Sequence, residues 1–177
     1  MREEVIMAGS GGQGIMFAGT LLAHAAMEEG LNVTYFPSYG AEMRGGTANC
    51  AVIISVENIG SPVVTNPSAL LAMNEGSLER FASKVKKGGL IIVNSSLSKK
   101  EMRIDGVEVS KIPATELAEK LGDSRVANMV ILGAYINRRK VVSLERTMES
   151  LRKMLGEGRG DLLKLNREAL RKGEECR

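Results

Sequence analysis

Short apolar runs alternate with helical stretches along most of this chain, and this alternation constrains the fold more than any other feature. Apolar runs closed by Gly or Pro are typical of buried strands, and a 3.6-residue period is typical of helices. We expect strands at 5–8, 32–36, 47–56, 69–73, 90–94 and 107–112, and helices at 15–29, 75–85, 113–121, 126–138, 143–155 and 161–172. Strands that alternate with helices predict an α/β protein, a three-layer α/β/α sandwich with a mostly parallel, Rossmann-like sheet.

The chain has the length of one ordinary domain, with 177 residues. We therefore expect a single domain over residues 1–177. The Gly-rich segment 156–160 sets off only a C-terminal helical arm at about 161–172. This arm either docks on another subunit or covers the sheet.

Composition excludes several classes of protein. No apolar run approaches the ~20 residues that span a bilayer, and the start of the chain is unlike a signal peptide. The two cysteines, Cys50 and Cys176, do not form a disulfide framework. The basic groups, such as Lys84–Lys87, are typical of solvated helix ends, and a nucleic-acid surface is disfavoured because no aromatic residues interleave with them. We expect a cytoplasmic protein without membrane or nucleic-acid partners.

A Gly-rich loop follows the first expected strand and opens the first expected helix. Its residues are Gly9, Gly11, Gly12, Gln13 and Gly14, which contain the pattern G-x-G-x-x-G. Glycines permit positive φ and close backbone approach, and the helix N-terminus presents unpaired N–H groups, so a phosphate or other anion would suit this site. The Gln13 amide is placed to meet a ligand or a partner chain. A tight turn that binds nothing is the alternative.

Dinucleotide binding is a second alternative for this loop. A Rossmann NAD site needs an acidic residue near the end of the second strand. That strand ends in Tyr35-Phe36-Pro37-Ser38, and Glu28 and Glu29 lie before it. A P-loop is excluded because no Gly-Lys-Ser/Thr follows the glycines.

A second polar, Gly-rich segment lies between the second and third strands. Its candidate binding residues are Ser38, Tyr39, Glu42, Arg44, Gly45 and Gly46. Arg44 can bind a phosphate or carboxylate, and Glu42 can pair with it. Because loops at the carboxyl ends of parallel strands line the binding crevice, we expect both loops to converge on one anion-binding edge. A surface loop with a local ion pair is the alternative.

The two motifs in this order, Gly-Ser-Gly-Gly-Gln-Gly and Ser-Tyr-Gly-Ala-Glu-Met-Arg-Gly-Gly, resemble those of the gamma subunit of 2-oxoacid:ferredoxin oxidoreductases. The resemblance extends over about residues 4–170. It implies an oxidoreductase complex that decarboxylates a 2-oxoacid oxidatively to an acyl-CoA and passes electrons to ferredoxin. It also implies that the gamma subunit is non-redox, is inactive alone and contributes to coenzyme A binding and assembly.

The same resemblance assigns the other cofactors and the partners. Thiamine diphosphate, magnesium and iron–sulfur clusters belong to partner subunits, alpha and beta with or without delta, and ferredoxin is an indirect partner. Two distant cysteines agree with this division, because a cluster takes four thiolates. We expect no catalytic or metal-binding residue in this chain, and we expect self-association when it is isolated.

The second loop resembles the 2-oxoglutarate and branched-chain types more than the pyruvate type, so 2-oxoglutarate is favoured. A free-standing NAD(P)-dependent oxidoreductase and a nucleotide-binding regulatory module are the competing functions. The single histidine, His24, lies on the outer face of its expected helix and is not a catalytic candidate.

Overall fold

The computed structural model describes residues 1–39 and 47–176, and the side chain of Tyr39 is not described. Within these ranges the chain forms six strands and six α-helices. The elements are β1 (Arg2–Ser10), α1 (Ile15–Glu28), β2 (Asn32–Tyr39), β3 (Thr47–Ser55), β4 (Ala69–Ala72), α2 (Glu75–Phe81), the 3₁₀ turn η1 (Ala82–Lys84), β5 (Leu90–Asn94), β6 (Glu108–Ile112), α3 (Ala114–Lys120), the 3₁₀ turn η2 (Ser124–Val126), α4 (Ala127–Arg139), α5 (Leu144–Leu155) and α6 (Gly160–Glu174).

The strands form one sheet in the order β2-β3-β1-β4-β5-β6. The pairs β1–β4, β4–β5 and β5–β6 are parallel, as predicted. Strand β3 is antiparallel to both of its neighbours, β1 and β2. The segment between β2 and β3 is too short for the crossover that a parallel pair needs, so β3 reverses direction. Strand β2 therefore points the same way as β1, and the sheet is mostly parallel.

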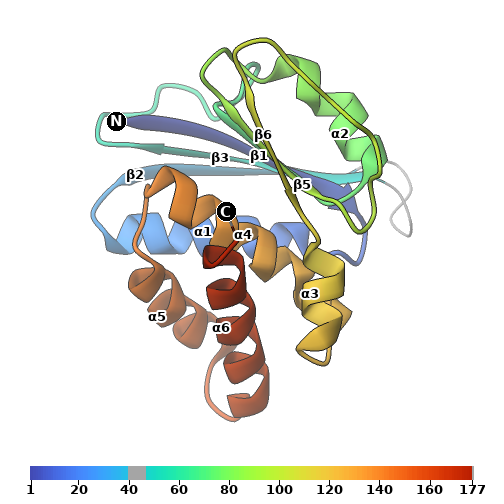
Figure 1. Cartoon of the computed structure of the whole chain (residues 1–177). Coiled ribbons are helices and arrows are strands. Elements are labelled where there is room, and N and C mark those ends of the chain that lie inside the picture. The colour runs from blue at the N-terminus through green and yellow to red at the C-terminus, as the bar shows by residue number, and fades with distance from the viewer. Residues whose placement is uncertain (40–46, 177) are drawn as a thin grey trace.

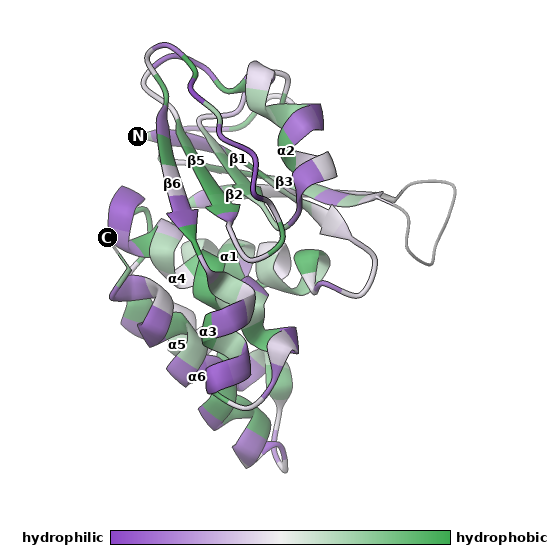
Figure 2. Cartoon of the chain, turned by 45° about the vertical axis from the view of Figure 1, so that its right-hand side comes forward, coloured by the Kyte–Doolittle hydropathy of each residue, from purple (hydrophilic) through white to green (hydrophobic). Residues whose placement is uncertain are grey.

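Helices cover both faces of the sheet (Figure 1). Alternate residues of β1 explain this arrangement: Val5 and Met7 enter the core under α1 and α4, whereas Ile6 and Ala8 enter a smaller core under α2. Helices α3, α5 and α6 lie on the same side of the sheet as α1 and α4. Figure 2 shows hydrophobic residues along the strands and hydrophilic residues on the outer surfaces of α5 and α6. The prediction of a three-layer α/β/α sandwich is confirmed.

The prediction that Pro37 ends the second strand is wrong. Strand β2 continues through Pro37 to Tyr39 and keeps its register with β3, with Pro37 opposite Cys50. Because β2 is an edge strand, the missing N–H of Pro37 can face away from the ladder without breaking it. Other boundaries differ by a few residues; the helix expected at 75–85, for example, becomes α2 followed by η1.

Helix α6 packs against α4 through glycines on both helices. A Cβ atom on Gly133 of α4 would lie 2.0 Å from the carbonyl oxygen of Leu170, and a Cβ atom on Gly173 would lie 1.9 Å from that of Val130. Ala169 and Leu170 are completely buried in this contact. The expected C-terminal arm thus covers another helix and not the sheet. That it also docks on a partner subunit stays a prediction.

Candidate anion-binding site

The Gly-rich loop lies at the carboxyl edge of the sheet, where β1 ends. Gly12 and Gly14 have φ values of 94° and 68°, which favour glycine. A Cβ atom on Gly14 would lie 2.3 Å from Nδ2 of Asn128, which donates a hydrogen bond to the Gly14 carbonyl. A Cβ atom on Gly9 would lie 2.5 Å from the side-chain oxygen of Gln13. The glycines are therefore required by the fold as well as suited to a ligand.

Gly12 is an open point of this loop. It is exposed, and apart from its two chain neighbours no atom lies within 4 Å of the position of its Cβ. The first helical hydrogen bond of α1 runs from Ala18 N to Gly14 O. The N–H groups of residues 15–17 therefore have no carbonyl partner within the helix, and Gly14 has no side chain to cap them. A backbone that is open to solvent beside a helix N-terminus suits an anion.

The two ends of the second Gly-rich segment lie at the same edge. In the ladder Ser10 lies opposite Thr47, and Tyr39 lies opposite Ala48. The expected reason holds: β2 follows β1 through α1 and points the same way, so both segments follow carboxyl ends at one edge, and the reversed β3 lies between the two strands. Ser38 is half-buried in β2. The candidates Glu42, Arg44, Gly45 and Gly46 lie outside the described residues, so their contact with a ligand stays a prediction.

The carbonyl of Gln13 has a role within the chain. Its Oε1 accepts hydrogen bonds from the Ser10 N–H, at 2.7 Å, and from Asn74 Nδ2, at 3.3 Å. Gln13 also lines a hollow of about 180 Å³, together with Gly12, Met73 and Arg125. Its amide oxygen is therefore committed to shaping the loop.

Arg125 is the cation that sequence reasoning missed. It lies in η2 and lines the hollow beside Gln13 as well as a second hollow of about 320 Å³, and Gly12 also lines both. Its guanidinium contacts the Asp123 carboxylate at 2.9 and 2.6 Å. These hydrogen bonds lower the pKa of Asp123. The Arg125 side chain is nevertheless 82% exposed to solvent. A ligand phosphate can reach this arginine without displacing buried structure.

No spacing in the sequence connects Arg125 with a glycine more than a hundred positions earlier. Sequence reasoning also missed Asn74 and Asn94, although a signal for them exists. Asn74 directly follows the expected strand 69–73 and Asn94 ends the expected strand 90–94, and polar residues at the carboxyl ends of parallel strands are candidates for a site.

The geometry argues against the dinucleotide reading. In a Rossmann site the strand that carries the ribose-binding acid lies next to β1, but here the reversed β3 occupies that place. Glu28 and Glu29 contact α5 instead: Glu28 pairs with Lys153 at 2.9 Å, and Glu29 accepts a hydrogen bond from the Ser143 hydroxyl at 2.8 Å.

The single histidine and Cys50 were not site candidates, and their surroundings agree with that. His24 is exposed, and Cys50 is completely buried, which raises the pKa of its thiol to about 12. Among residues 1–39 and 47–176, no three His, Cys, Asp or Glu side chains are placed to hold a metal ion. In the same ranges, no helix is both long enough and apolar enough to cross a membrane.

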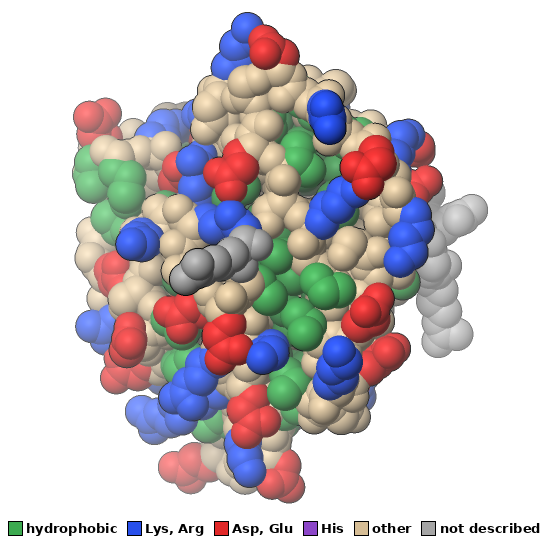
Figure 3. Space-filling model, in the orientation of Figure 1, with side chains coloured by type: hydrophobic (Ala, Val, Ile, Leu, Met, Phe, Trp, Pro, Cys, Tyr) green, Lys and Arg blue, Asp and Glu red, His purple; other side chains and the backbone are tan. Residues whose placement is uncertain are grey.

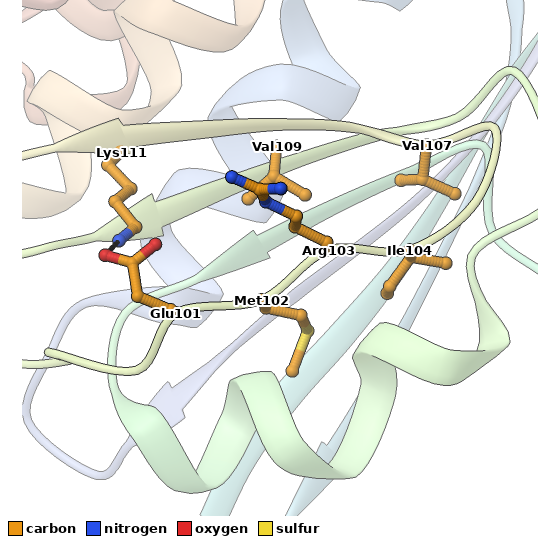
Figure 4. A pocket seen from close by; sticks show the side chains of 7 residues that line it. All are labelled: Glu101, Met102, Arg103, Ile104, Val107, Val109 and Lys111. Atoms are coloured by element: carbon orange, nitrogen blue, oxygen red, sulfur yellow. Dashed lines mark hydrogen bonds and ion pairs between the residues drawn. The ribbon is translucent and has the colours of Figure 1, made fainter.

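A further hollow of about 490 Å³ lies on the α2 side of the sheet, beside β6 (Figure 4). Its apolar floor includes Ile104, Val107 and Val109, and the ion pair between Glu101 and Lys111 lies at its rim. Figure 3 shows basic and acidic side chains interspersed over the face seen in Figure 1. This mixture offers no continuous basic stripe on that face.

Comparison with known proteins places the chain in one family. The family model described as pyruvate ferredoxin/flavodoxin oxidoreductase matches residues 4–176. The 2-oxoglutarate synthase subunit KorC of Methanothermobacter marburgensis is 38% identical over 89% of this chain and 89% of its own length. The ketoisovalerate oxidoreductase subunit VorA of Methanothermobacter thermautotrophicus is 37% identical over 97% of this chain. The chain spans only 35% of that VorA subunit.

Two solved structures have the same fold over almost the entire chain. One is the gamma subunit of a keto/oxoacid ferredoxin oxidoreductase from Geobacter sulfurreducens, with a TM-score of 0.82 and 31% identity over 98% of this chain and 96% of that one. The other is the 2-oxoglutarate:ferredoxin oxidoreductase from Magnetococcus marinus with 2-oxoglutarate, coenzyme A and succinyl-CoA bound. It has a TM-score of 0.89 and 29% identity over 98% of this chain and 30% of that one. This chain therefore belongs to the pyruvate ferredoxin/flavodoxin oxidoreductase family.

Proposed function

We propose that this chain is the gamma-type subunit of a 2-oxoacid:ferredoxin oxidoreductase and that its Gly-rich edge binds coenzyme A. Support for the subunit comes from the likeness to KorC and to the gamma subunit from Geobacter sulfurreducens, each matched over most of its own length. Support for the ligand comes from the Magnetococcus marinus enzyme, whose structure contains coenzyme A.

The observation that carries the ligand assignment is the open backbone of Gly12 between α1 and Arg125. Coenzyme A supplies the thiol that accepts the acyl group, and its phosphates are the part that this edge suits. The N–H groups of the first turn of α1 face the anion, and the Arg125 guanidinium adds a charge-assisted contact. Arg44, from the second Gly-rich segment, is proposed as a further cation at the same site.

We assign thiamine diphosphate, magnesium and iron–sulfur clusters to the alpha and beta subunits, with or without delta, and we assign ferredoxin to the complex as a whole. The KorC relatives favour 2-oxoglutarate as the oxidised acid, whereas the VorA relatives favour a branched-chain acid. We propose 2-oxoglutarate because the KorC subunit matches the chain length as well as the sequence.

The test uses the assembled complex, purified from its native source through a tag on this chain. Arg125→Ala should raise the KM for coenzyme A by about one to two decades, as expected for loss of a hydrogen bond to a charged group. Reduction of the enzyme by 2-oxoacid without coenzyme A should not change. Arg152→Ala, an exposed arginine on α5, is the matched control. An unchanged KM for coenzyme A in Arg125→Ala would show that this edge does not bind it.

A further inference from the structure

Amide side chains lie at the ends of three strands along the carboxyl edge of the sheet. Gln13 follows β1, Asn74 follows β4, and Asn94 is the last residue of β5. Asn94 is completely buried; its Nδ2 donates to the carbonyl of Met73 at 3.4 Å and to the hydroxyl of Thr115 at 2.8 Å. Each amide thus joins the end of its own strand to a neighbouring segment.

Asn74 is the link that reaches the Gly-rich loop. Its Nδ2 donates to the Ser10 hydroxyl at 2.8 Å and to the Gln13 Oε1 at 3.3 Å. The same Gln13 oxygen accepts the hydrogen bond from the Ser10 backbone N–H. Two side chains from different segments therefore meet at the point where the chain leaves β1 and enters the loop.

The other end of the Asn74 amide has its own partner. Its Oδ1 accepts a hydrogen bond from the Ser77 N–H at 2.9 Å and so caps the N-terminus of α2. Since Oδ1 is engaged by the helix, the orientation of the amide is determined, and Nδ2 faces Ser10 and Gln13. The start of α2 thereby holds a hydrogen-bond donor against the loop.

The Gln13 side chain uses the space beside Gly9. It folds back over Gly9, where any Cβ atom would lie 2.5 Å from its Oε1 and 3.0 Å from the Cβ of Met73. This arrangement combines the absence of a side chain at position 9, an acceptor at position 13 and a donor at position 74.

We propose that Asn74 is a positioning residue: through Gln13 and Ser10 it holds the Gly-rich loop in the conformation that leaves Gly12 and the first turn of α1 open to a ligand. Gln13 acts in the same network through its carbonyl oxygen. The consequence for coenzyme A rests on the proposed function above, whereas the conformation of the loop does not.

Substitutions at Asn74 and at Gln13 distinguish three interactions: the hydrogen bond that Asn74 donates to Gln13, the cap that Asn74 gives α2, and the hydrogen bond that Gln13 accepts from Ser10. Asn74→Asp keeps an oxygen to cap α2 but removes the donor. The Gln13 amide must then turn Nε2 toward the new carboxylate, which takes Oε1 away from the Ser10 N–H. Gln13→Glu keeps the acceptor, and Gln13→Met removes it at similar size. Asn66→Asp is the matched control, because the exposed Asn66 amide contacts only the Lys84 carbonyl among the hydrogen bonds of the described chain.

The measurements are amide hydrogen exchange of a peptide covering residues 10–14 and steady-state kinetics, both on the assembled complex. Asn74→Asp and Gln13→Met should accelerate exchange of this peptide by about tenfold, the factor that corresponds to one net hydrogen bond. Gln13→Glu and Asn66→Asp should leave the exchange near that of the unmodified complex. Asn74→Asp should also raise the KM for coenzyme A by a similar factor with kcat little changed.

Unchanged exchange in Asn74→Asp would overturn the positioning role. Faster exchange with an unchanged KM for coenzyme A would uphold the positioning role and refute the proposed binding of coenzyme A at this loop. If Asn74→Asp does not fold, the Gln13 pair decides: equal exchange in Gln13→Met and Gln13→Glu would overturn the inference.

Discussion

Replacing Gly133 by alanine tests how closely α4 and α6 must approach. The new Cβ atom would lie 2.0 Å from the Leu170 carbonyl oxygen, and it would meet backbone atoms that no rotamer change can move. To reach an ordinary contact near 3.4 Å, α6 must shift by more than 1 Å relative to α4. That shift disturbs the completely buried Ala169 and Leu170.

The expected cost follows from two opposing effects. Overpacking of a core typically costs about 1–3 kcal/mol, whereas alanine in place of glycine inside a helix is favourable by about 0.5–1 kcal/mol. Because the contact is with backbone, overpacking dominates, and Gly133→Ala should lower the free energy of unfolding by about 1–2 kcal/mol. For a chain of this size that corresponds to a fall in Tm of roughly 2–8 °C.

Thermal and urea unfolding of the isolated chain measure this change. Gly160→Ala is the control, because this glycine starts α6 and no atom lies within 4 Å of its Cβ position. The control gains helix propensity without overpacking and should be neutral or slightly stabilising. If Gly133→Ala were as stable as Gly160→Ala, the close approach of the two helices would be refuted.

Four further outcomes are expected. Gly12→Val should raise the KM for coenzyme A in the assembled complex with little effect on coenzyme A-independent reduction, because a branched side chain blocks the open backbone; an unchanged KM would contradict this. Native iodoacetamide labelling, read by mass spectrometry, should modify the half-buried Cys176 before the buried Cys50. The Cys50 pKa is raised to about 12 from an ordinary 9.0, so its contribution to stability is intact below pH 9 and is lost as the pH rises toward 12. The isolated chain should contain no stoichiometric iron and show no turnover of 2-oxoacids, which metal analysis and activity assays check. It should also self-associate, because apolar residues such as Phe36, 51% exposed, lie on its surface, and sedimentation checks this.

Much of the architecture could be read from local patterns. Apolar runs and helical periodicity depend on the burial of the segment itself, so strands such as Leu90–Asn94 were predictable. Helix caps such as Ser143 depend on the residue type at the helix start and were predictable as well. The Gly-rich loop between β1 and α1 was predictable for the same reason, because positive φ at Gly12 and Gly14 is a local requirement. The family resemblance also rested on such continuous motifs.

The tertiary structure decided what depends on segments that are distant in the chain. Strand periodicity does not specify which neighbour a strand pairs with, so the reversal of β3 and the edge position that accommodates Pro37 became evident only in the assembled sheet. The hydrogen bonds of Asn74 to the Gly-rich loop cross more than sixty positions, and the hollows shared by Arg125 and Gly12 join segments still farther apart. A sequence pattern records the surroundings of each residue along the chain, whereas a binding edge forms from residues that only folding brings together.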